Sequence, residues 1–429
     1  MILDATIIKT IGELVQNTRR SLNMTITQLS ELSGVPRATI SRIENGEVKR
    51  PEFSSVRPLA VTLNIPFETL VDYYVEVEKR AESLLHILQS TIRQESSTEL
   101  IRKVATKYLE SPNEDSFDLT ERLYQHIDSI EDTSIKLSLY NLIVEHSRSH
   151  GIMPYIAKGM YRCYLIERND FSKLKETYSH GKYVLHYIDF LSQQEQIELY
   201  YKLGVHAFNL KFYKESIHHC KKILAEDSNA SHHKVNALGI LIEAYFCIGE
   251  YEESEFYCLQ YKQFNYPNVQ ENVVLAEALI KAKKGNTDLA IEQLLTFLKT
   301  CSDLSALPAT KNLLQLYLQQ NNLKDAKTLL ENSKIDSTIL DKGNPFIFSG
   351  YADYLRIKGE YYLALGNYET CVTYMVEAAL NYSKVNDTTK EKECLNTVVR
   401  IHLEHSVSPQ STFEKLNTYF IQSSKELED

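Results

Sequence analysis

The stretch TQLSELSGVPRATISRIENG, residues 27–46, decides the fold of the N-terminal part of the chain. Two helical segments meet there at Gly34, and glycine tolerates the positive φ of a sharp turn. Ser30 is small where the two helices would cross, and Pro36 suits the first turn of a helix, where a missing N–H costs little. The stretch therefore predicts a helix-turn-helix whose second helix covers residues 36–44.

Five short helical segments are expected between residues 6 and 70, around this motif. Four apolar residues of the motif can hold its second helix at a fixed angle to the first, namely Leu29, Val35, Ile40 and Ile43. Asn45-Gly46 is a stop signal at the end of that helix. The segment is therefore expected to fold as a five-helix bundle.

Charge is distributed unevenly along the 429 residues. Residues 1–70 carry eight Lys/Arg and seven Asp/Glu, whereas the remainder carries 39 and 50, and the whole chain has a formal net charge of −10. Five cations lie close together in the N-terminal segment: Arg37, Arg42, Lys49, Arg50 and Arg57. A locally basic surface on an acidic protein is typical of contacts with nucleic-acid phosphates.

From IGELVQNTRRSLN (11–23) through the motif to RPEFSSVRPLAVTLNIPFETL (50–70), the sequence resembles the phage-repressor-like XRE/Cro family. Ser30 departs from the alanine that is usual in the family, but it is also small. The resemblance implies a protein that binds a double-stranded DNA operator, with the helix over 36–44 in the major groove.

The resemblance also assigns roles to individual residues of the N-terminal segment. The residues expected near base edges are Arg37, Ala38, Thr39, Ser41 and Arg42. Thr27 and Gln28 are expected to contact the DNA backbone or support base readout. The residues expected over phosphates are Asn45, Lys49 and Arg50.

In the rest of the chain, apolar residues recur at three- and four-residue spacing, which is typical of helices, and no sustained alternation predicts strands. Six segments share a pattern. Each has a turn residue: Asn169, Lys211, Gly249, Gly285, Asn321 or Gly366. Two residues later comes a mostly aromatic or aliphatic residue: Phe171, Tyr213, Tyr251, Thr287, Leu323 or Tyr368. Three residues further lies a mostly small one: Leu174, Ser216, Ser254, Ala290, Ala326 or Cys371.

The spacings between the small positions, 42, 38, 36, 36 and 45 residues, resemble the tetratricopeptide repeat, whose period is about 34 residues. A small residue lets the second helix of a pair lie close to the first, and the turn residue tolerates left-handed backbone. The predicted fold is all-α. It comprises the helix-turn-helix bundle (1–70), a linker helix (71–96) and a right-handed repeat solenoid (97–429).

Residues 73–94 are expected to form one long connecting helix with an apolar stripe. The stripe either packs on the following helices or forms a dimer contact. A dimer is expected because a single small DNA-binding module buries too little surface for useful specificity.

The first helix of each repeat should line a concave surface, where polar side chains can bind an extended peptide. The inward positions expected from the repeat register are Lys202, Asn209, Asn236, Glu243, Asn272, Asn312, Gln315, Gln319, Asp353, Arg356 and Glu360. Any exposed helix face also carries such residues, so the set as a whole supports a peptide groove better than any one member does.

A repressor-like domain followed by such repeats resembles the RRNPP family of cytoplasmic peptide-pheromone receptors. The resemblance implies a homodimeric transcription regulator whose DNA affinity changes when a short signalling peptide binds the repeats. Two alternatives stay open: the repeats dock a protein partner such as a response regulator, or they carry an enzyme such as a phosphatase.

Composition excludes several other classes of protein. There is no apolar run long enough to span a bilayer and no secretory leader, so a cytoplasmic location is expected. Seven scattered cysteines without a CxxC motif argue against disulfides and structural zinc, and the histidine pairs lack accompanying metal ligands. No catalytic constellation is found, so neither enzymatic activity, a metal nor a cofactor is expected.

Overall fold

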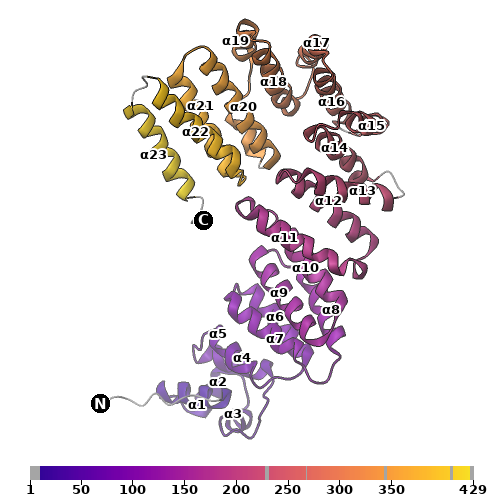
Figure 1. Ribbon diagram of the computed structural model, residues 1–429. Coiled ribbons are helices and arrows are strands. Elements are labelled where there is room, and N and C mark those ends of the chain that lie inside the picture. Colours follow the sequence, from indigo (N-terminus) through magenta and orange to yellow (C-terminus); the bar gives the residue numbers. More distant parts are fainter. Residues whose placement is uncertain (1–9, 228–230, 267, 343–344, 406–408, 426–429) are drawn as a thin grey trace. The chain divides into compact units, whose positions relative to one another are not determined.

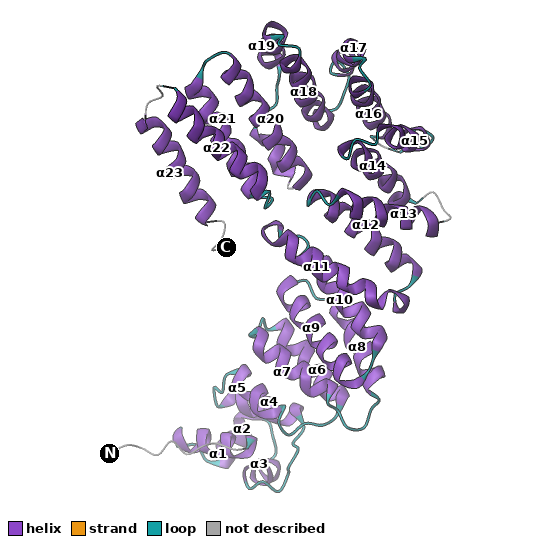
Figure 2. Cartoon of the chain, viewed as in Figure 1, coloured by secondary structure: helices purple, strands orange, loops and turns teal. Residues whose placement is uncertain are grey.

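The computed structural model describes residues 10–227, 231–266, 268–342, 345–405 and 409–425. Within these ranges the secondary structure is helical, without any strand (Figure 2). This confirms the predicted all-α class. By their internal contacts the residues form two compact units, unit 1 (Met1–Ile166) and unit 2 (Glu167–Asp429).

Unit 1 begins with the predicted five-helix bundle and continues with five further helices. Its helices are α1 (Ile11–Ser21), α2 (Ile26–Ser33), α3 (Arg37–Glu44), α4 (Phe53–Thr62), α5 (Phe67–Tyr74), α6 (Ala81–Arg93), α7 (Thr98–Leu109), α8 (Ser116–Ile127), α9 (Thr133–His150) and α10 (Met153–Glu167). A continuous apolar core runs through both groups of helices.

Local sequence signals set the ends of the helix-turn-helix. Thr25 caps α2 in a capping box with Gln28, which satisfies backbone N–H groups that the first turn leaves unpaired. Gly34 ends α2 with φ +73°. The Ser30 hydroxyl donates to the Val35 carbonyl at 2.7 Å, so this serine is small enough for the crossing and also ties the turn. α2 and α3 therefore form the predicted motif.

The prediction of one continuous helix over residues 73–94 is wrong, because α5 ends at Tyr74 and α6 begins at Ala81. The buried Glu78 carboxylate accepts hydrogen bonds from the Tyr74 hydroxyl (3.1 Å) and the Arg80 backbone N–H (2.9 Å). The chain turns around this carboxylate instead of continuing the helix. The apolar stripe of α6, with Leu84 and Leu88, is buried in the unit 1 core and so is not an exposed dimer surface.

Unit 2 consists of helix pairs. Its elements are η1 (Phe171–Lys173), α11 (Leu174–Val184), η2 (Leu185–Phe190), α12 (Gln193–Asn209), α13 (Tyr213–Glu226), α14 (His232–Cys247), α15 (Tyr251–Tyr261), α16 (Val269–Lys283), α17 (Thr287–Phe297), α18 (Asp303–Gln319), α19 (Leu323–Asn332), η3 (Ser337–Lys342), α20 (Pro345–Ala364), α21 (Tyr368–Ser383), α22 (Thr388–Glu404) and α23 (Pro409–Lys425).

The predicted repeat register is confirmed in five pairs. Their second helices begin at the predicted aromatic or aliphatic residues, namely Tyr213, Tyr251, Thr287, Leu323 and Tyr368. The small positions three residues later are fully buried, and the turn residues before them have positive φ. The Ser216 and Ser254 hydroxyls donate to carbonyls of the preceding helix, at Gly204 (2.8 Å) and Ile242 (2.7 Å). Both bonds span twelve residues, so the pairs cross in the same way.

The turn at Asn169 departs from the expected pattern, because this residue does not have a positive φ. Asp170 instead accepts hydrogen bonds from the backbone N–H (3.0 Å) and hydroxyl of Ser172, and the chain enters the second helix through η1. Hydrogen bonds to the Asp170 side chain thus stabilise this turn, whereas the other five turns use a residue with left-handed backbone.

The pairs of unit 2 follow one another along an arc (Figure 1). Their first helices contact each other in succession, α12 with α14, then α16, α18 and α20. Helices that are not neighbours in this series also meet: the rings of Phe208 on α12 and Phe346 on α20 lie 6.4 Å apart. The first helices therefore line the concave face of the arc.

Candidate DNA interface and concave face

The solvent-facing side of α3 carries the residues expected to read DNA. Ile40, Ile43 and Glu44 are buried on the opposite side of this helix. None of the ten residues predicted to contact DNA is buried. Gln28, Arg37, Ala38, Arg42, Asn45, Lys49 and Arg50 are exposed, and Thr27, Thr39 and Ser41 are half-buried. The Gln28 side chain also has a local structural part, since its oxygen accepts the Thr25 backbone N–H at 2.8 Å.

The two arginines of α3 are held only loosely. Arg37 lies 3.6 Å from Glu31, and Arg42 lies 3.8 Å from Glu47. All four side chains are about 60% exposed or more, and ion pairs of this kind contribute at most about 1 kcal/mol. A phosphate or a base edge can therefore displace the acidic partner at little cost.

A buried ion pair fixes α3 against α1. Arg19 donates to both carboxylate oxygens of Glu44, at 2.7 and 2.6 Å, and to the Met24 carbonyl at 2.7 Å. The Glu44 side chain is only 2% exposed. Such bidentate bonds fix orientation as well as distance, so the pair sets the angle at which α3 presents its outer face.

The same crossing requires a residue without a side chain. A Cβ at Gly12 would lie 2.2 Å from the carbonyl oxygen of Ile43, inside contact distance. Sequence reasoning missed Gly12, Arg19 and Glu44. A signal was present, because Arg19 follows Ile11 and Val15 at four-residue spacing and so falls on the apolar face of its helix.

The residues expected on the concave face all lie on first helices of the pairs. Lys202 and Asn209 are on α12, Asn236 and Glu243 on α14, Asn272 on α16, Asn312, Gln315 and Gln319 on α18, and Asp353, Arg356 and Glu360 on α20. None belongs to the buried core. These residues therefore lie on the helices predicted to carry them, and their role in peptide binding stays a prediction.

Several of these side chains already have partners within the protein. Asn236 donates to the Tyr201 hydroxyl at 3.3 Å, Asn272 to the Tyr261 hydroxyl at 3.2 Å, and Asn312 to a carbonyl of its own helix at 2.8 Å. Arg356 pairs with Glu360 one turn away. The bonds of Asn236 and Asn272 join neighbouring helices of the arc, whereas those of Asn312 and Arg356 lie within one helix. A ligand would have to compete with all of them.

Asp353 is the centre of a charge cluster formed by three helix pairs. Its carboxylate contacts Lys390 on α22, lies 3.5 Å from Lys311 on α18 and accepts the Tyr382 hydroxyl at 2.6 Å. Burial alone would raise the pKa of Asp353, but the two ammonium groups hold it at about 2. The cluster ties the last three pairs together, so Asp353 is first of all structural.

Glu243 has a different environment on the same face. Its side chain is exposed to solvent, and the described residues offer it no hydrogen bond or ion pair. The surrounding protein still limits its solvation and raises its pKa, and the charge of Lys311 acts against this rise. An exposed, partially desolvated carboxylate is available to a ligand, unlike Asp353.

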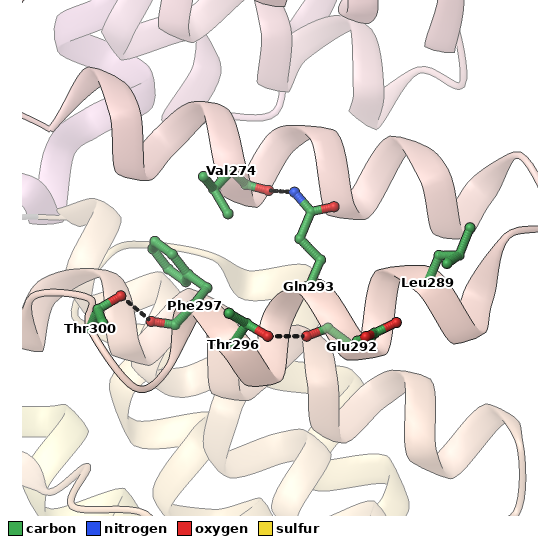
Figure 3. A pocket seen from close by; sticks show the side chains of 7 residues that line it. All are labelled: Val274, Leu289, Glu292, Gln293, Thr296, Phe297 and Thr300. Carbon is green, nitrogen blue, oxygen red and sulfur yellow. Dashed lines mark hydrogen bonds between the residues drawn. The ribbon is translucent and has the colours of Figure 1, made fainter.

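A shallow recess lies between α16 and α17 (Figure 3). The residues that line it are Val274, Leu289, Glu292, Gln293, Thr296, Phe297 and Thr300. The Gln293 side chain crosses it and donates to the Val274 carbonyl at 3.3 Å. No residue expected on the concave face is among those lining it, so this recess is distinct from the expected peptide site.

Comparison with known proteins supports the assignment of the N-terminal motif. Residues 15–70 match the helix-turn-helix family HTH_3. Over 60 residues, 14% of this chain, the sequence is 38% identical to the uncharacterized HTH-type transcriptional regulator RghRB and 42% identical to the HTH-type transcriptional repressor RghR, both of Bacillus subtilis (strain 168). The matched segment spans 43% and 44% of those relatives. Unit 1 thus contains a helix-turn-helix domain of the kind found in transcription regulators.

The whole chain is also similar to a solved structure, a signal transduction ATPase with numerous domains from Pyrococcus horikoshii that has a tetratricopeptide repeat sensor. That similarity covers 97% of this chain and 73% of that one, at 12% identity and a TM-score of 0.44. The repeat architecture is supported by the regular series of helix pairs in unit 2. Among the described helices, none combines the length and apolar character needed to cross a membrane.

Replacing Arg19 by methionine is expected to loosen α3 without touching its outer face. Arg19→Met keeps the apolar stem but leaves Glu44 buried without its counterion, which should cost about 3 kcal/mol. Hydrogen exchange of the α1 and α3 amides measures the loss. Arg20→Ala removes the neighbouring exposed arginine and should leave the exchange unchanged; equal effects of the two variants would contradict the assigned role.

Asp353→Asn is expected to destabilise unit 2 by about 2 kcal/mol at neutral pH, because two lysines lose their counterion. The folded-state pKa lies below the unfolded value, so the stabilisation is present above about pH 4 and disappears as the pH falls towards 2. Thermal unfolding of both proteins from pH 7 to pH 3 should show the difference shrinking. Asp303→Asn, at an exposed helix start, is the control; a difference independent of pH would refute the charge assignment.

Proposed function

We propose that this protein is a transcription regulator that binds an operator through α3, and that a short peptide on the concave face of unit 2 controls this binding. The observation that carries the proposal is the outer face of α3, which presents Arg37 and Arg42 on a helix fixed by the buried Arg19–Glu44 pair. In this proposal residues 1–70 bind DNA and unit 2 binds the ligand, while α6 to α10, which belong to unit 1, link the two along the sequence.

The chemistry of α3 suits readout in the major groove. Arginine can donate two parallel hydrogen bonds to guanine, and the short side chains of Ala38 and Ser41 let the helix approach the base edges. Lys49 and Arg50 follow the helix, are exposed and can contact phosphates. The acidic remainder of the chain disfavours non-specific adhesion to DNA, so binding would concentrate on this surface.

A homodimer belongs to the proposal. One module of this size contacts a single half-site, whereas two modules on a two-fold axis read a palindromic operator. In a dimer, the distance between the two α3 helices would decide whether both half-sites can be occupied. A ligand that changes the shape of unit 2 could alter that distance, which links peptide binding to DNA affinity.

Peptide control is supported by the polar side chains on the concave face that are not committed to the fold. Glu243, Gln315 and Gln319 are exposed there, on α14 and α18. Amides donate and accept at once, which suits an extended peptide backbone, and the carboxylate can accept further N–H groups. The resemblance to peptide-pheromone receptors in domain order favours the same ligand class over a docked protein partner.

Arg37→Ala and Arg42→Ala should each weaken specific DNA binding by about 5- to 150-fold, because each loses a bidentate base contact. Selection from random duplexes by the full-length protein gives the operator, and fluorescence anisotropy gives the affinity. Lys49→Ala should instead weaken binding to all sequences and lower the salt dependence by about one ion. Arg20→Ala is the control; selection that yields no preferred sequence would refute operator recognition.

Glu243→Gln should weaken the binding of the controlling peptide roughly tenfold, because a charge-assisted hydrogen bond is lost. The peptides to test are those encoded by short reading frames beside the gene, with operator affinity as the readout. Glu252→Gln on α15 replaces an exposed carboxylate of a second helix and should respond like the wild type. If no such peptide binds or changes operator affinity, peptide control is wrong.

A further inference from the structure

The turn between α12 and α13 contains an unfavourable residue. Lys211 has φ +62°, in the left-handed region, whereas three sister turns have glycine there with φ of +72° to +91°. Asn321 has a similar φ, but asparagine tolerates it because its short side chain can bond locally. Lysine lacks that advantage. A strained residue of this kind points to a function for its side chain.

The Lys211 side chain reaches the other end of the arc. Its Nζ lies 2.5 Å from Oδ2 of Asp387, 176 residues later, in the turn between α21 and α22. Asp387 is itself held in place, because its other oxygen caps α22 by accepting the Lys390 backbone N–H at 3.3 Å. The Asp387 side chain is 11% exposed, so the ion pair is partly shielded from water.

Two further contacts join the same ends. Asn386, also left-handed with φ +54°, donates from Nδ2 to the Ser172 carbonyl at 3.1 Å. The rings of Phe208, three residues before Lys211, and Phe346, at the start of α20, lie 6.4 Å apart. The arc is therefore closed by two polar contacts between turns and one partly exposed ring contact, whereas neighbouring pairs are joined by buried apolar side chains. The closure is weaker than these joins, because it consists of a few partly exposed contacts, which contribute little.

We propose that Lys211, Asn386 and Asp387 form a clasp that holds the arc of unit 2 closed, and that opening the clasp increases the access of water to its concave face. The clasp needs no ligand. The further consequence, that its opening admits an extended peptide, rests on the proposed function. Because the closing contact is an ion pair, salt weakens the clasp while leaving the apolar joins between pairs intact.

Cys247 provides a native reporter of the opening. It ends α14 and its side chain is exposed. Besides limited solvation, its thiol responds to the Tyr213 hydroxyl, to the Glu243 carboxylate and, more weakly, to Lys311 and Lys390 of the last three pairs. The surrounding protein limits its solvation and raises the pKa of its thiol. This loss of solvation is the largest influence on the thiol and outweighs that of the two lysines, so opening the arc, which admits water, lowers the pKa and increases the fraction of reactive thiolate.

The experiment measures the rate at which iodoacetamide alkylates Cys247 in the full-length wild type and its variants. Mass spectrometry of the peptide that contains Cys247 gives the alkylated fraction. Lys211→Gly removes the side chain while suiting the turn, and Asp387→Asn removes the charge while keeping a good helix cap. Each should accelerate alkylation roughly two- to fivefold. Asn321→Gly changes a left-handed turn outside the clasp and is the matched control. Cys301, half-buried after α17, is the internal reference.

The expected pattern is faster alkylation of Cys247 in both clasp variants and in the wild type at high salt, with Asn321→Gly and the Cys301 rate unchanged. An unchanged Cys247 rate in both clasp variants would overturn the proposal. Equal acceleration in Asn321→Gly, or at Cys301, would also overturn it, because general loosening would then explain the effect. No peptide is present in the assay, so failure of peptide control would leave this result standing.

Discussion

Helices in both units cross at distances that side chains of ordinary size would prevent. In unit 1, α1 meets α3 at Gly12, where even one added carbon would lie 2.2 Å from a backbone oxygen. In unit 2, a Cβ at Gly204 would lie 2.9 Å from the Cys220 sulfur. Close crossing brings the backbone of one helix within reach of side chains on the other, as the Ser216 hydroxyl bond shows. The position of α3 and the regular stacking of the pairs both depend on this closeness.

Charges removed from water have positioning roles in both units. Arg19 and Glu44 join α1 to α3, and Asp353 joins α20 to α18 and α22 through two lysines. A buried charge is costly without a partner, so each arrangement is tolerated in one geometry and penalised in others. The charges expected to meet DNA are instead exposed and weakly paired, as for Arg37. Burial thus separates the charges that build the protein from those that can bind a partner.

The two units have different kinds of polar surface. The surface of α3 is small, rigidly held and locally basic, which suits a fixed target such as a DNA groove. The concave face of unit 2 combines side chains that are bonded to the protein, such as Asn236 and Asn272, with others that are not, such as Glu243. Successive pairs contact mainly their neighbours, so small rotations between them add up along the arc and are opposed by the contacts at its ends.

The sequence by itself determined the helices, the helix-turn-helix and the repeat register, because apolar spacing, caps and left-handed turn residues act within a few positions. It predicted the starts of five second helices, including Tyr213 and Tyr251, and the exposed face of α3. Only the tertiary structure decided which charges are paired. Arg19 and Glu44 are 25 residues apart and Lys211 and Asp387 176 apart, so no local pattern specifies their contact. The break before α6 also escaped prediction, because it depends on Glu78 being buried, and burial is a property of the folded chain.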